Sequence, residues 1–467
     1  MLIFKGKVVL GSQPGPGSVA KTPRKWLVMV LMTITALLVF SARANDLMTQ
    51  NGPTKVQVRQ IGGQWKLLVD GRPFFIKGAG MEFGDYEQLA TAGGNSFRTW
   101  RPSTGNETGR QLLDHAQKDG LYVTMGMDLA TERHGFDYSD TNAVAQQFAR
   151  MKSDVLEFKD HPALLLWDIG NELNLDTHNP RVWDAVNEIS KMIHQLDPNH
   201  PTTTSLAGIN EDLVKIIKER APDLDFISVQ SYADIVNLPV ELQASGWVGP
   251  YAITEWGPTG HWECGLTTWG APIEDNSSAK AKCYQQRYQK VIAVDPSHCL
   301  GSYVFLWGQK QERTPTWYGM FLASGEATEA VDVMEQLWTG AWPKDRCPEL
   351  NGLWLANKTA ADNVHLLTDH RYPAKVDVVS PSQSSMTYDW EIMEESSAKT
   401  IGGDHESTAD AVLGSIPKNA NAEVEIRAPS KPGAYRLYIY VLDAHRKAAY
   451  ANIPFYVDEV QTAGISH

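Results

Sequence analysis

Short apolar runs alternate with helical patterns over the first two thirds of the chain. From Phe74 onward, runs rich in Val, Ile and aromatic residues predict eight strands, at residues 74–80, 95–100, 121–129, 163–173, 202–208, 226–232, 251–256 and 301–307. Between them apolar residues recur every three or four positions, which predicts helices, most clearly over 109–120, 142–158, 180–196, 210–221 and 326–338. Eight such units in roughly 290 residues match the size of a (β/α)8 TIM barrel.

The pattern changes near residue 345, where helical periodicity gives way to short strand-like segments. These predicted strands lie at residues 374–380, 386–393, 421–428, 434–443 and 451–457. Residues 434–443 alternate between apolar side chains such as Leu437 and a second set that includes Arg436 and Tyr438, which gives the strand two different faces. We therefore expect a catalytic barrel over residues 53–345 and a small immunoglobulin-like β-sandwich over 346–467.

The N-terminus has the pattern of a secretory signal. Lys21, Arg24 and Lys25 precede an apolar run over residues 26–40, which ends at the A-x-A sequence of residues 42–44. The run is shorter than the ~20 residues that a helix needs to cross a bilayer. We expect residues 1–44 to be removed and the mature protein to be periplasmic or extracellular, with no stable membrane insertion.

Charge limits the classes of partner. The whole chain has a net charge of −13, and residues 1–44 contain Lys and Arg but no acidic residue, so the mature chain is more acidic still. Nucleic acid and anionic membrane surfaces are therefore poor partners.

All four cysteines, Cys264, Cys283, Cys299 and Cys347, follow the signal. An oxidising compartment would permit two disulfides in any of three connectivities. The grouping of Cys264 and Cys283 around one long loop favours a bridge there, with free buried thiols as the alternative. The cysteines and histidines form no metal-binding motif, so we expect no metal and no other cofactor.

Two glutamates carry the main functional signal. Glu172 ends the fourth predicted barrel strand, in WDIGNEL, and Glu255 ends the seventh, in YAITEWG. Active sites of TIM barrels are built at the C-terminal ends of the strands. Cleavage of a glycosidic bond with retention needs one protonated carboxyl as proton donor and one ionised carboxylate as nucleophile, about 5–5.5 Å apart. Either glutamate alone could be a helix cap or an ion-pair partner, but the two together predict glycoside chemistry.

These motifs resemble the catalytic module of clan A glycoside hydrolases, most closely family 2, over about residues 56–342. The resemblance implies that Glu172 is the acid/base and Glu255 the nucleophile. It also implies that Asn171 binds the sugar 2-hydroxyl, an interaction that strengthens in the transition state. Because neighbouring strand residues point to opposite faces, we expect the strand end to bend so that Asn171 and Glu172 both reach the ligand.

The same resemblance assigns three more strand-end residues. Arg98 matches the arginine beside the nucleophile, where its charge would keep Glu255 ionised. Tyr232 matches the tyrosine that hydrogen-bonds the nucleophile, and Trp307 matches the tryptophan under the reacting sugar.

The chain departs from the family pattern in three places. The third strand ends in Met127 and Asp128, where many relatives have histidine, and Gln230 stands where many have histidine or asparagine. Asp128 and Gln230 are therefore candidate substrate contacts, and the resemblance does not predict the identity of the sugar. Family 2 enzymes usually carry β-sandwich domains before the barrel, and roughly 30 mature residues ahead of Phe74 are too few for one.

Two tryptophans, Trp262 and Trp269, lie in the predicted loop over residues 257–278 after the Glu255 strand. Aromatic rings at a barrel mouth can stack on the apolar faces of sugar rings, although loop tryptophans serve as often in packing. They favour a polysaccharide substrate.

The sequence therefore predicts a retaining β-glycoside hydrolase that cleaves a β-linked oligo- or polysaccharide, with β-glucan favoured, by double displacement. A transglycosylase that uses the same covalent intermediate is the nearest alternative. A non-catalytic polysaccharide-binding envelope protein is the second alternative.

Overall fold

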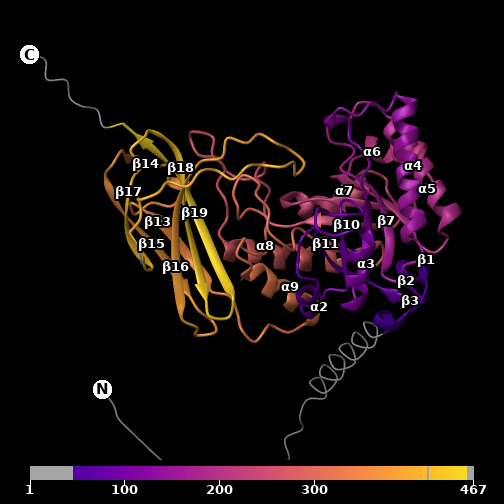
Figure 1. The fold of residues 1–467 in the computed structure, drawn as a ribbon, viewed down its shortest axis with the longest axis horizontal. Coiled ribbons are helices and arrows are strands. Elements are labelled where there is room, and N and C mark those ends of the chain that lie inside the picture. The colour runs from indigo at the N-terminus through magenta and orange to yellow at the C-terminus, as the bar shows by residue number, and fades with distance from the viewer. Residues whose placement is uncertain (1–45, 418–419, 460–467) are drawn as a thin grey trace, which may run out of the picture. The chain divides into compact units, whose positions relative to one another are not determined.

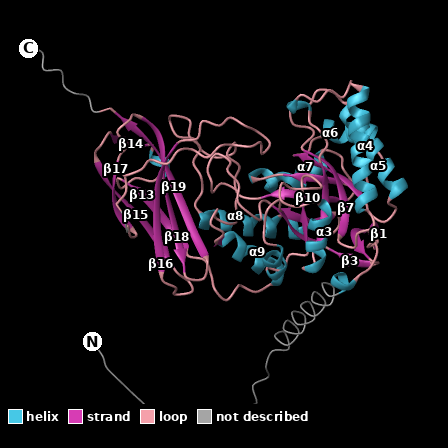
Figure 2. Ribbon diagram, viewed as in Figure 1, coloured by secondary structure: helices cyan, strands magenta, loops and turns pink. Residues whose placement is uncertain are grey.

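The computed structural model describes residues 46–417 and 420–459, so the predicted signal segment lies outside the described residues. Eight parallel strands form a closed barrel with helices around it (Figures 1 and 2). In barrel order they are β4 (Ile76–Gly80), β5 (Ser96–Arg98), β6 (Tyr122–Met127), β7 (Leu164–Asn171), β8 (Thr202–Ala207), β9 (Ile227–Gln230), β10 (Tyr251–Trp256) and β11 (Cys299–Val304). The predicted TIM barrel is confirmed, and each strand overlaps its predicted range.

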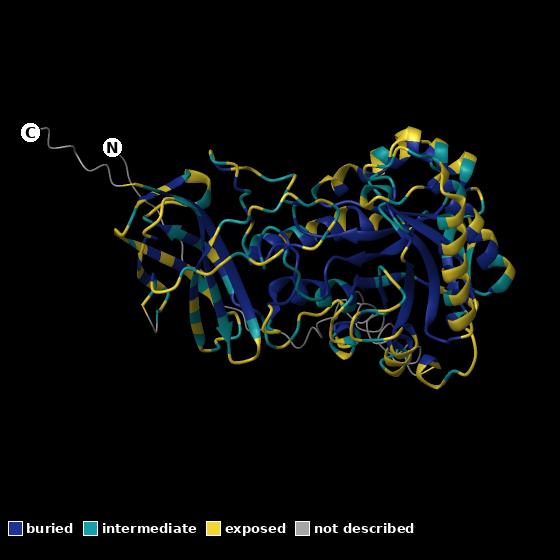
Figure 3. Cartoon of the chain, turned by 45° about the horizontal axis from the view of Figure 1, so that its top comes forward, coloured by how far each residue is buried: buried dark blue, intermediate teal, exposed yellow. Residues whose placement is uncertain are grey.

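The barrel strands are buried along nearly their whole length, as expected for parallel strands covered by helices (Figure 3). The helices are α2 (Tyr86–Thr91), α3 (Gly109–Lys118), α4 (Thr141–Phe158), α5 (Arg181–Leu196), α6 (Glu211–Arg220), α7 (Leu238–Ala244), α8 (Ser277–Lys290) and α9 (Glu329–Thr339). Side chains of Thr108, Asp140, Asn210 and Asn276 accept hydrogen bonds from the first turns of α3, α4, α6 and α8. Local capping thus fixes several helix starts.

A small antiparallel sheet precedes the barrel and closes its N-terminal end. It comprises β1 (Val56–Ile61), β2 (Gln64–Val69) and β3 (Arg72–Phe74). The backbone N–H of Val56 donates to the carbonyl oxygen of Asn199 at 2.8 Å, and that of Trp65 donates to Ser297 at 2.7 Å. Because Asn199 and Ser297 directly precede barrel strands β8 and β11, this sheet lies at the end opposite the C-terminal strand ends.

Two sheets form the C-terminal domain. One has the order β12-β19-β18-β16, with β14 also paired to β19, and the other has the order β13-β15-β17. Their bounds are β12 (Ala327–Thr328), β13 (Glu349–Leu355), β14 (Val364–Leu367), β15 (Arg371–Val379), β16 (Met386–Glu394), β17 (Glu423–Arg427), β18 (Gly433–Asp443) and β19 (Lys447–Asp458). Apolar side chains of both sheets, such as Val376 and Leu437, pack in one core, so the predicted sandwich is present.

Residues on both faces of β18 are buried over 435–439. Leu437 belongs to the sandwich core, whereas Arg436, on the opposite face, is 1% exposed and donates to the carbonyl oxygen of Pro272 at 2.8 Å. Pro272 lies in the segment between β10 and α8 of the barrel. The second face of β18 is therefore an interface with the barrel, which explains why it carries long polar and aromatic side chains.

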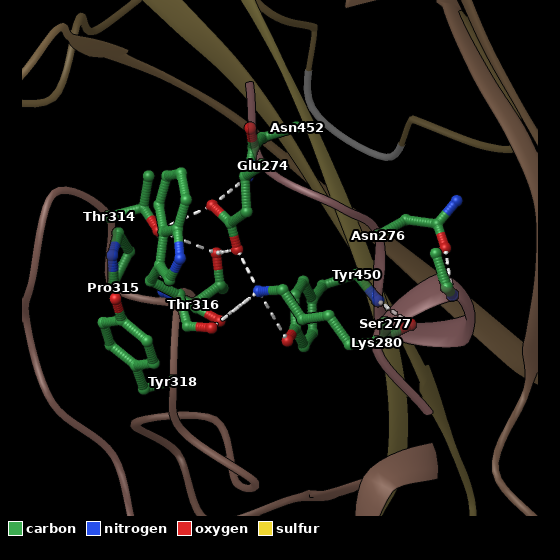
Figure 4. Close-up of polar contacts among 12 residues, drawn as sticks. Glu274, Asn276, Ser277, Lys280, Thr314, Pro315, Thr316, Tyr318, Tyr450 and Asn452 are labelled. Carbon is green, nitrogen blue, oxygen red and sulfur yellow. Dashed lines mark hydrogen bonds and ion pairs between the residues drawn. The ribbon is translucent and has the colours of Figure 1, made fainter. Parts of the chain in front are cut away.

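A buried polar cluster around Glu274 joins the two domains (Figure 4). Its carboxylate accepts hydrogen bonds from Lys280, Thr316 (2.9 Å), Thr314 (2.6 Å) and Asn452 on β19 (2.6 Å). Lys280, on α8, also donates to two backbone carbonyls and to the hydroxyl of Tyr450. Every charge in this cluster thus has several partners in low-dielectric surroundings, which is the condition for a tolerable buried ion pair.

The predicted disulfide between Cys264 and Cys283 is wrong, because all four cysteines are free thiols. Cys264 donates to the carbonyl oxygen of His261, and Cys347 is fully buried and donates to that of Ala327. Burial raises the pKa of the Cys283 thiol on α8. The positions of Cys264 and Cys283 on either side of one predicted loop did not show whether their thiols would lie within bonding distance.

Within residues 46–417 and 420–459, no helix combines the length and the apolar character that crossing a membrane requires.

Candidate active site

A cavity of about 1570 Å³ opens at the C-terminal ends of the barrel strands. Its lining includes the predicted residues Asp128, Asn171, Glu172, Gln230, Tyr232, Glu255 and Trp262. The volume exceeds the ~300–1000 Å³ of ordinary small-molecule pockets, so several linked sugar rings could enter.

The carboxylate of Glu255, on β10, accepts four hydrogen bonds. One oxygen accepts from Arg98 (2.7 Å), Trp100 (2.8 Å) and Gln230 (3.1 Å), and the other accepts from the hydroxyl of Tyr232 (3.1 Å). Burial, followed by the charge of Glu255, raises the pKa of Tyr232 well above its ordinary value, so this hydroxyl remains a donor. Donors at the ends of two strands, β5 and β9, thus fix the orientation of this one carboxylate.

Arg98, at the end of β5, is fully buried behind Glu255. Its guanidinium pairs with Glu255 at 2.7 Å and with Asp168 on β7 at 3.2 Å. Ser205 donates to Asp168 at 2.6 Å. The second carboxylate, that of Asp168, therefore fixes the orientation of the Arg98 guanidinium beside Glu255.

Asn171 is oriented by its neighbours. Its side-chain oxygen accepts from Gln230 at 2.7 Å and from Arg98 at 2.9 Å. Because the oxygen is engaged twice, the amide nitrogen is the part of this side chain that can donate to a sugar hydroxyl. The side-chain amide of Gln230 donates hydrogen bonds to both Asn171 and Glu255. It therefore helps to position two residues that would contact the ligand.

The end of β7 bends, as expected from the need to bring Asn171 and Glu172 to the same ligand. Glu172 has a φ of 50° and Gly170 a φ of 80°, both in the left-handed region. The Glu172 N–H nevertheless donates to the carbonyl oxygen of Ser205 on β8 at 2.8 Å. A non-glycine residue in this conformation is uncommon and costs about 1–3 kcal/mol, a cost that often accompanies function.

The electrostatic surroundings of Glu172 favour its protonated form. Burial, followed by the negative charge of Glu255, raises the pKa of Glu172 to about 8, with Arg133 and Arg98 acting in the opposite direction. The two glutamates line one cavity and differ in their surroundings, and Glu172 is the one whose surroundings favour a proton.

The structure brings most predicted site residues together, but it places two tryptophans elsewhere. Trp262 is 59% exposed at the cavity, and its ring meets that of Tyr232 edge to face at 5.4 Å. Trp307 is fully buried and contacts Phe321 and Trp338, because Phe305 and Leu306 occupy the cavity wall just before it. The predicted sugar contact of Trp307 is therefore not supported.

Trp269 likewise does not line the cavity. Its ring packs against His365 and Tyr456, on β14 and β19 of the C-terminal domain, with centroid distances of 5.4 and 5.9 Å. The packing alternative holds for this loop tryptophan, whereas Trp262 in the same loop faces the cavity.

Sequence reasoning missed Trp100, Arg133 and Glu312. Trp100 follows Arg98 by two positions, and the strand-end location of this aromatic residue was the available signal. Arg133 and Glu312 lie in loops after β6 and β11, where nothing in the local pattern marks them. Among the described residues, no group of three or more His, Cys, Asp or Glu side chains is arranged to hold a metal ion.

Residues 85–267 match the family model "Glycosyl hydrolases family 2, TIM barrel domain". The chain is also similar to mannan endo-1,4-beta-mannosidase F of Aspergillus fumigatus, with 26% identity over 213 residues, 36% of this chain and 48% of the mannosidase. The chain thus spans about half the length of that relative.

Similar solved structures include a β-D-glucuronidase from Dictyoglomus thermophilum, at 17% identity and a TM-score of 0.49, covering 61% of this chain and 54% of that one. An FMN-binding β-glucuronidase from Facaelibacterium prausnitzii L2-6 has 13% identity and a TM-score of 0.49, covering 88% and 59%. The family match includes both Glu172 and Glu255. Over residues 85–267, the barrel of this chain is thus similar to the TIM barrel domain of glycosyl hydrolases family 2.

Proposed function

We propose that the protein is a retaining β-glycoside hydrolase in which Glu172 is the acid/base and Glu255 the nucleophile. The observation that carries this proposal is the contrast between the two carboxyl groups. Glu255 accepts four hydrogen bonds, one of them from Arg98, whereas burial and the charge of Glu255 raise the pKa of Glu172 to about 8. Double displacement requires this division of one ionised and one protonated carboxyl.

In the first step Glu255 attacks the anomeric carbon while the proton of Glu172 passes to the leaving oxygen, which breaks the glycosidic bond. In the second step water, deprotonated by Glu172, displaces Glu255 and restores both groups. Arg98 and Tyr232 hold the nucleophile in position for attack. The amide of Asn171 can donate to a sugar hydroxyl beside the anomeric carbon, where a hydrogen bond strengthens as the oxocarbenium ion develops.

We propose a neutral β-linked glycan as substrate, with β-glucans as the first candidates. The charges of the cavity support neutrality. Arg101 pairs with Glu82 at 2.9 Å, Lys310 with Glu312 at 2.9 Å and Arg133 with Asp404 at 3.1 Å. The Arg and Lys side chains along the cavity wall are thus already matched by carboxylates, and a sugar carboxylate would add negative charge beside Glu172 and Glu255.

Transglycosylation is the second candidate, favoured by one observation. The exposed ring of Trp262 stands beside Tyr232, the partner of Glu255, where an acceptor sugar could stack. The same covalent intermediate would then pass to a sugar hydroxyl instead of water.

Residues 1–44 support action in the periplasm or outside the cell, which cell fractionation with and without this segment would check.

Incubation of the purified protein with β-glucans, mannans, galactans and an aryl glucuronide tests these proposals. We expect cleavage of a neutral glycan and products whose anomeric configuration, followed by NMR during the first turnovers, matches that of the substrate. Products longer than the substrate at high oligosaccharide concentration would favour transfer. Inverted products would refute the mechanism, and preferential cleavage of the glucuronide would refute the substrate class.

A further inference from the structure

A segment of the C-terminal domain reaches the cavity that contains Glu172 and Glu255. This rim segment, residues 400–406, lies between β16 and β17. Five of its residues line the cavity: Ile401, Gly402, Gly403, Asp404 and His405. No other described residue beyond 345 contributes to the lining, so the rim segment is the sole contact of the sandwich with the cavity.

On one side the rim segment is fixed to the loop after β6. Arg133, whose side chain is 9% exposed, donates to the carbonyl oxygens of Ile401 (3.0 Å) and Gly402 (3.3 Å) and to the carboxylate of Asp404 (3.1 Å). His134 approaches the same carboxylate at 3.0 Å. Three bonds from one guanidinium leave the backbone here little freedom to move.

On the other side the rim segment is fixed to the loop after β11. Arg313 bonds the buried carboxylate of Glu406 at 2.8 Å and the carbonyl oxygen of Thr400 at 2.9 Å. Lys310 donates to the carbonyl oxygen of Gly403 at 2.6 Å. The segment therefore extends between two barrel loops that belong to strands β6 and β11.

Glycines permit this close approach. Gly402 has a φ of 60° and Gly403 a φ of 73°, a backbone region that other residues rarely adopt. A Cβ atom on Gly402 would lie 2.7 Å from the guanidinium of Arg133, and one on Gly403 would lie 2.8 Å from the ammonium of Lys310. Local sequence and barrel contacts thus specify the same loop conformation.

We propose that the rim segment forms a distal sugar-binding site of the catalytic cavity, at which the exposed His405 donates to or accepts from hydroxyls of a neutral sugar unit. The inference rests on the proposed glycosidase function. The described hydrogen bonds of the rim segment connect it to the loops after β6 and β11, and none of them reaches Glu172 or Glu255. Because its anchors hold it before the ligand arrives, little ordering cost opposes binding.

Comparison of a long and a short substrate tests the proposal. For His405→Ala we expect kcat/KM on an oligosaccharide of the cleaved glycan to fall about tenfold further than kcat/KM on its aryl monoglycoside, mainly through KM, since one hydrogen bond of the distal unit is lost. Asp404→Asn, which weakens the Arg133 anchor, should act in the same direction. His370→Ala, an exposed histidine of the same domain outside the cavity, is the matched control and should change neither value.

Binding provides a readout that does not need turnover. In a Glu172→Gln background, the additional His405→Ala change should raise the Kd of a β-glucan oligosaccharide about tenfold in titration calorimetry. Equal losses on the long and the short substrate, or an unchanged Kd, would overturn the distal site. A wild-type protein that cleaves no glycoside would instead refute the proposed function, and the Kd comparison would still decide the site.

Discussion

Two clusters of buried charge differ in how completely they are paired. In the interface cluster, Glu274 meets Lys280 and three further donors, and the neighbouring Arg436 meets Glu395 at 2.7 Å, so acids and bases match in number. In the site cluster, Arg98 pairs with two carboxylates, those of Asp168 and Glu255, and Glu172 is a third acid beside them.

The pKa directions follow this difference. Burial acts to raise the pKa of Glu274, but Lys280, Thr314 and Arg436 outweigh it and lower the value. At the barrel mouth, burial and the charge of Glu255 outweigh Arg133 and Arg98, and the pKa of Glu172 rises to about 8. Matched charges join two domains, whereas burial and a neighbouring carboxylate keep a proton on Glu172.

The largest effect is expected when the proposed nucleophile, Glu255, is removed. Glu255→Ala should lower kcat by a factor of about 10⁴ or more, because the covalent step has no substitute. Azide should restore turnover of an activated substrate and yield a glycosyl azide of inverted configuration, detected by NMR. Glu211→Ala, an exposed glutamate of α6, is the control. An unaltered kcat for Glu255→Ala would contradict the proposed catalytic role of the site cluster.

The interface cluster should affect stability instead. Lys280→Met leaves Glu274 buried without its cation, and we expect the free energy of unfolding to fall by about 3–5 kcal/mol in chemical denaturation. Lys290→Met, an exposed lysine at the end of the same helix, should change it by less than about 0.5 kcal/mol. Adding Glu274→Gln to Lys280→Met should recover part of the loss. A Lys280→Met protein as stable as the control would contradict the assignment of a structural role.

The smallest effect concerns the proton on Glu172 and the resulting pH dependence of activity and stability. Because the proposed acid, Glu172, must be protonated to donate its proton, kcat/KM should fall about tenfold per pH unit above roughly pH 8. The folded state then holds a proton that the unfolded state, with a glutamate pKa near 4.5, has lost. Between these two pKa values stability therefore decreases as pH rises.

Glu172→Gln removes this dependence. At pH 8 we expect the variant to be more stable than the wild type by on the order of 1 kcal/mol, a value discounted for the partial exposure of the side chain, and at pH 4 the difference should vanish. Thermal unfolding at both pH values measures it. A variant that is less stable at pH 8 would argue against a raised pKa in the folded protein.

Features encoded within a few neighbouring residues were predictable from sequence. Apolar runs predicted all eight barrel strands, and the strand-end positions of Glu172 and Glu255 predicted their common cavity, because parallel strands of a closed barrel end at one mouth. The bend at Asn171 also followed from strand alternation.

Features that depend on contacts between distant segments were not predictable in this way. Trp307 and Trp269 follow their strands as a substrate platform would, but the direction of each ring depends on α9 and on β14, far away in sequence. The contact of residues 400–406 with Arg133 joins segments about 270 residues apart, and no local pattern indicates it. The sequence showed that the face of β18 with Arg436 carries polar and aromatic side chains. It did not show that this face contacts the barrel.

The pairing of β12 with β19 has a consequence for evolution of the chain. A two-residue strand that precedes α9 of the barrel aligns with Lys447 and Ala448 at the start of the last long strand of the sandwich. Modules connected by free linkers can be exchanged between enzymes, but here a piece of one module completes a sheet of the other. Replacement of the sandwich by an unrelated module would therefore remove the pairing partner of β12, so the two domains are expected to be inherited together.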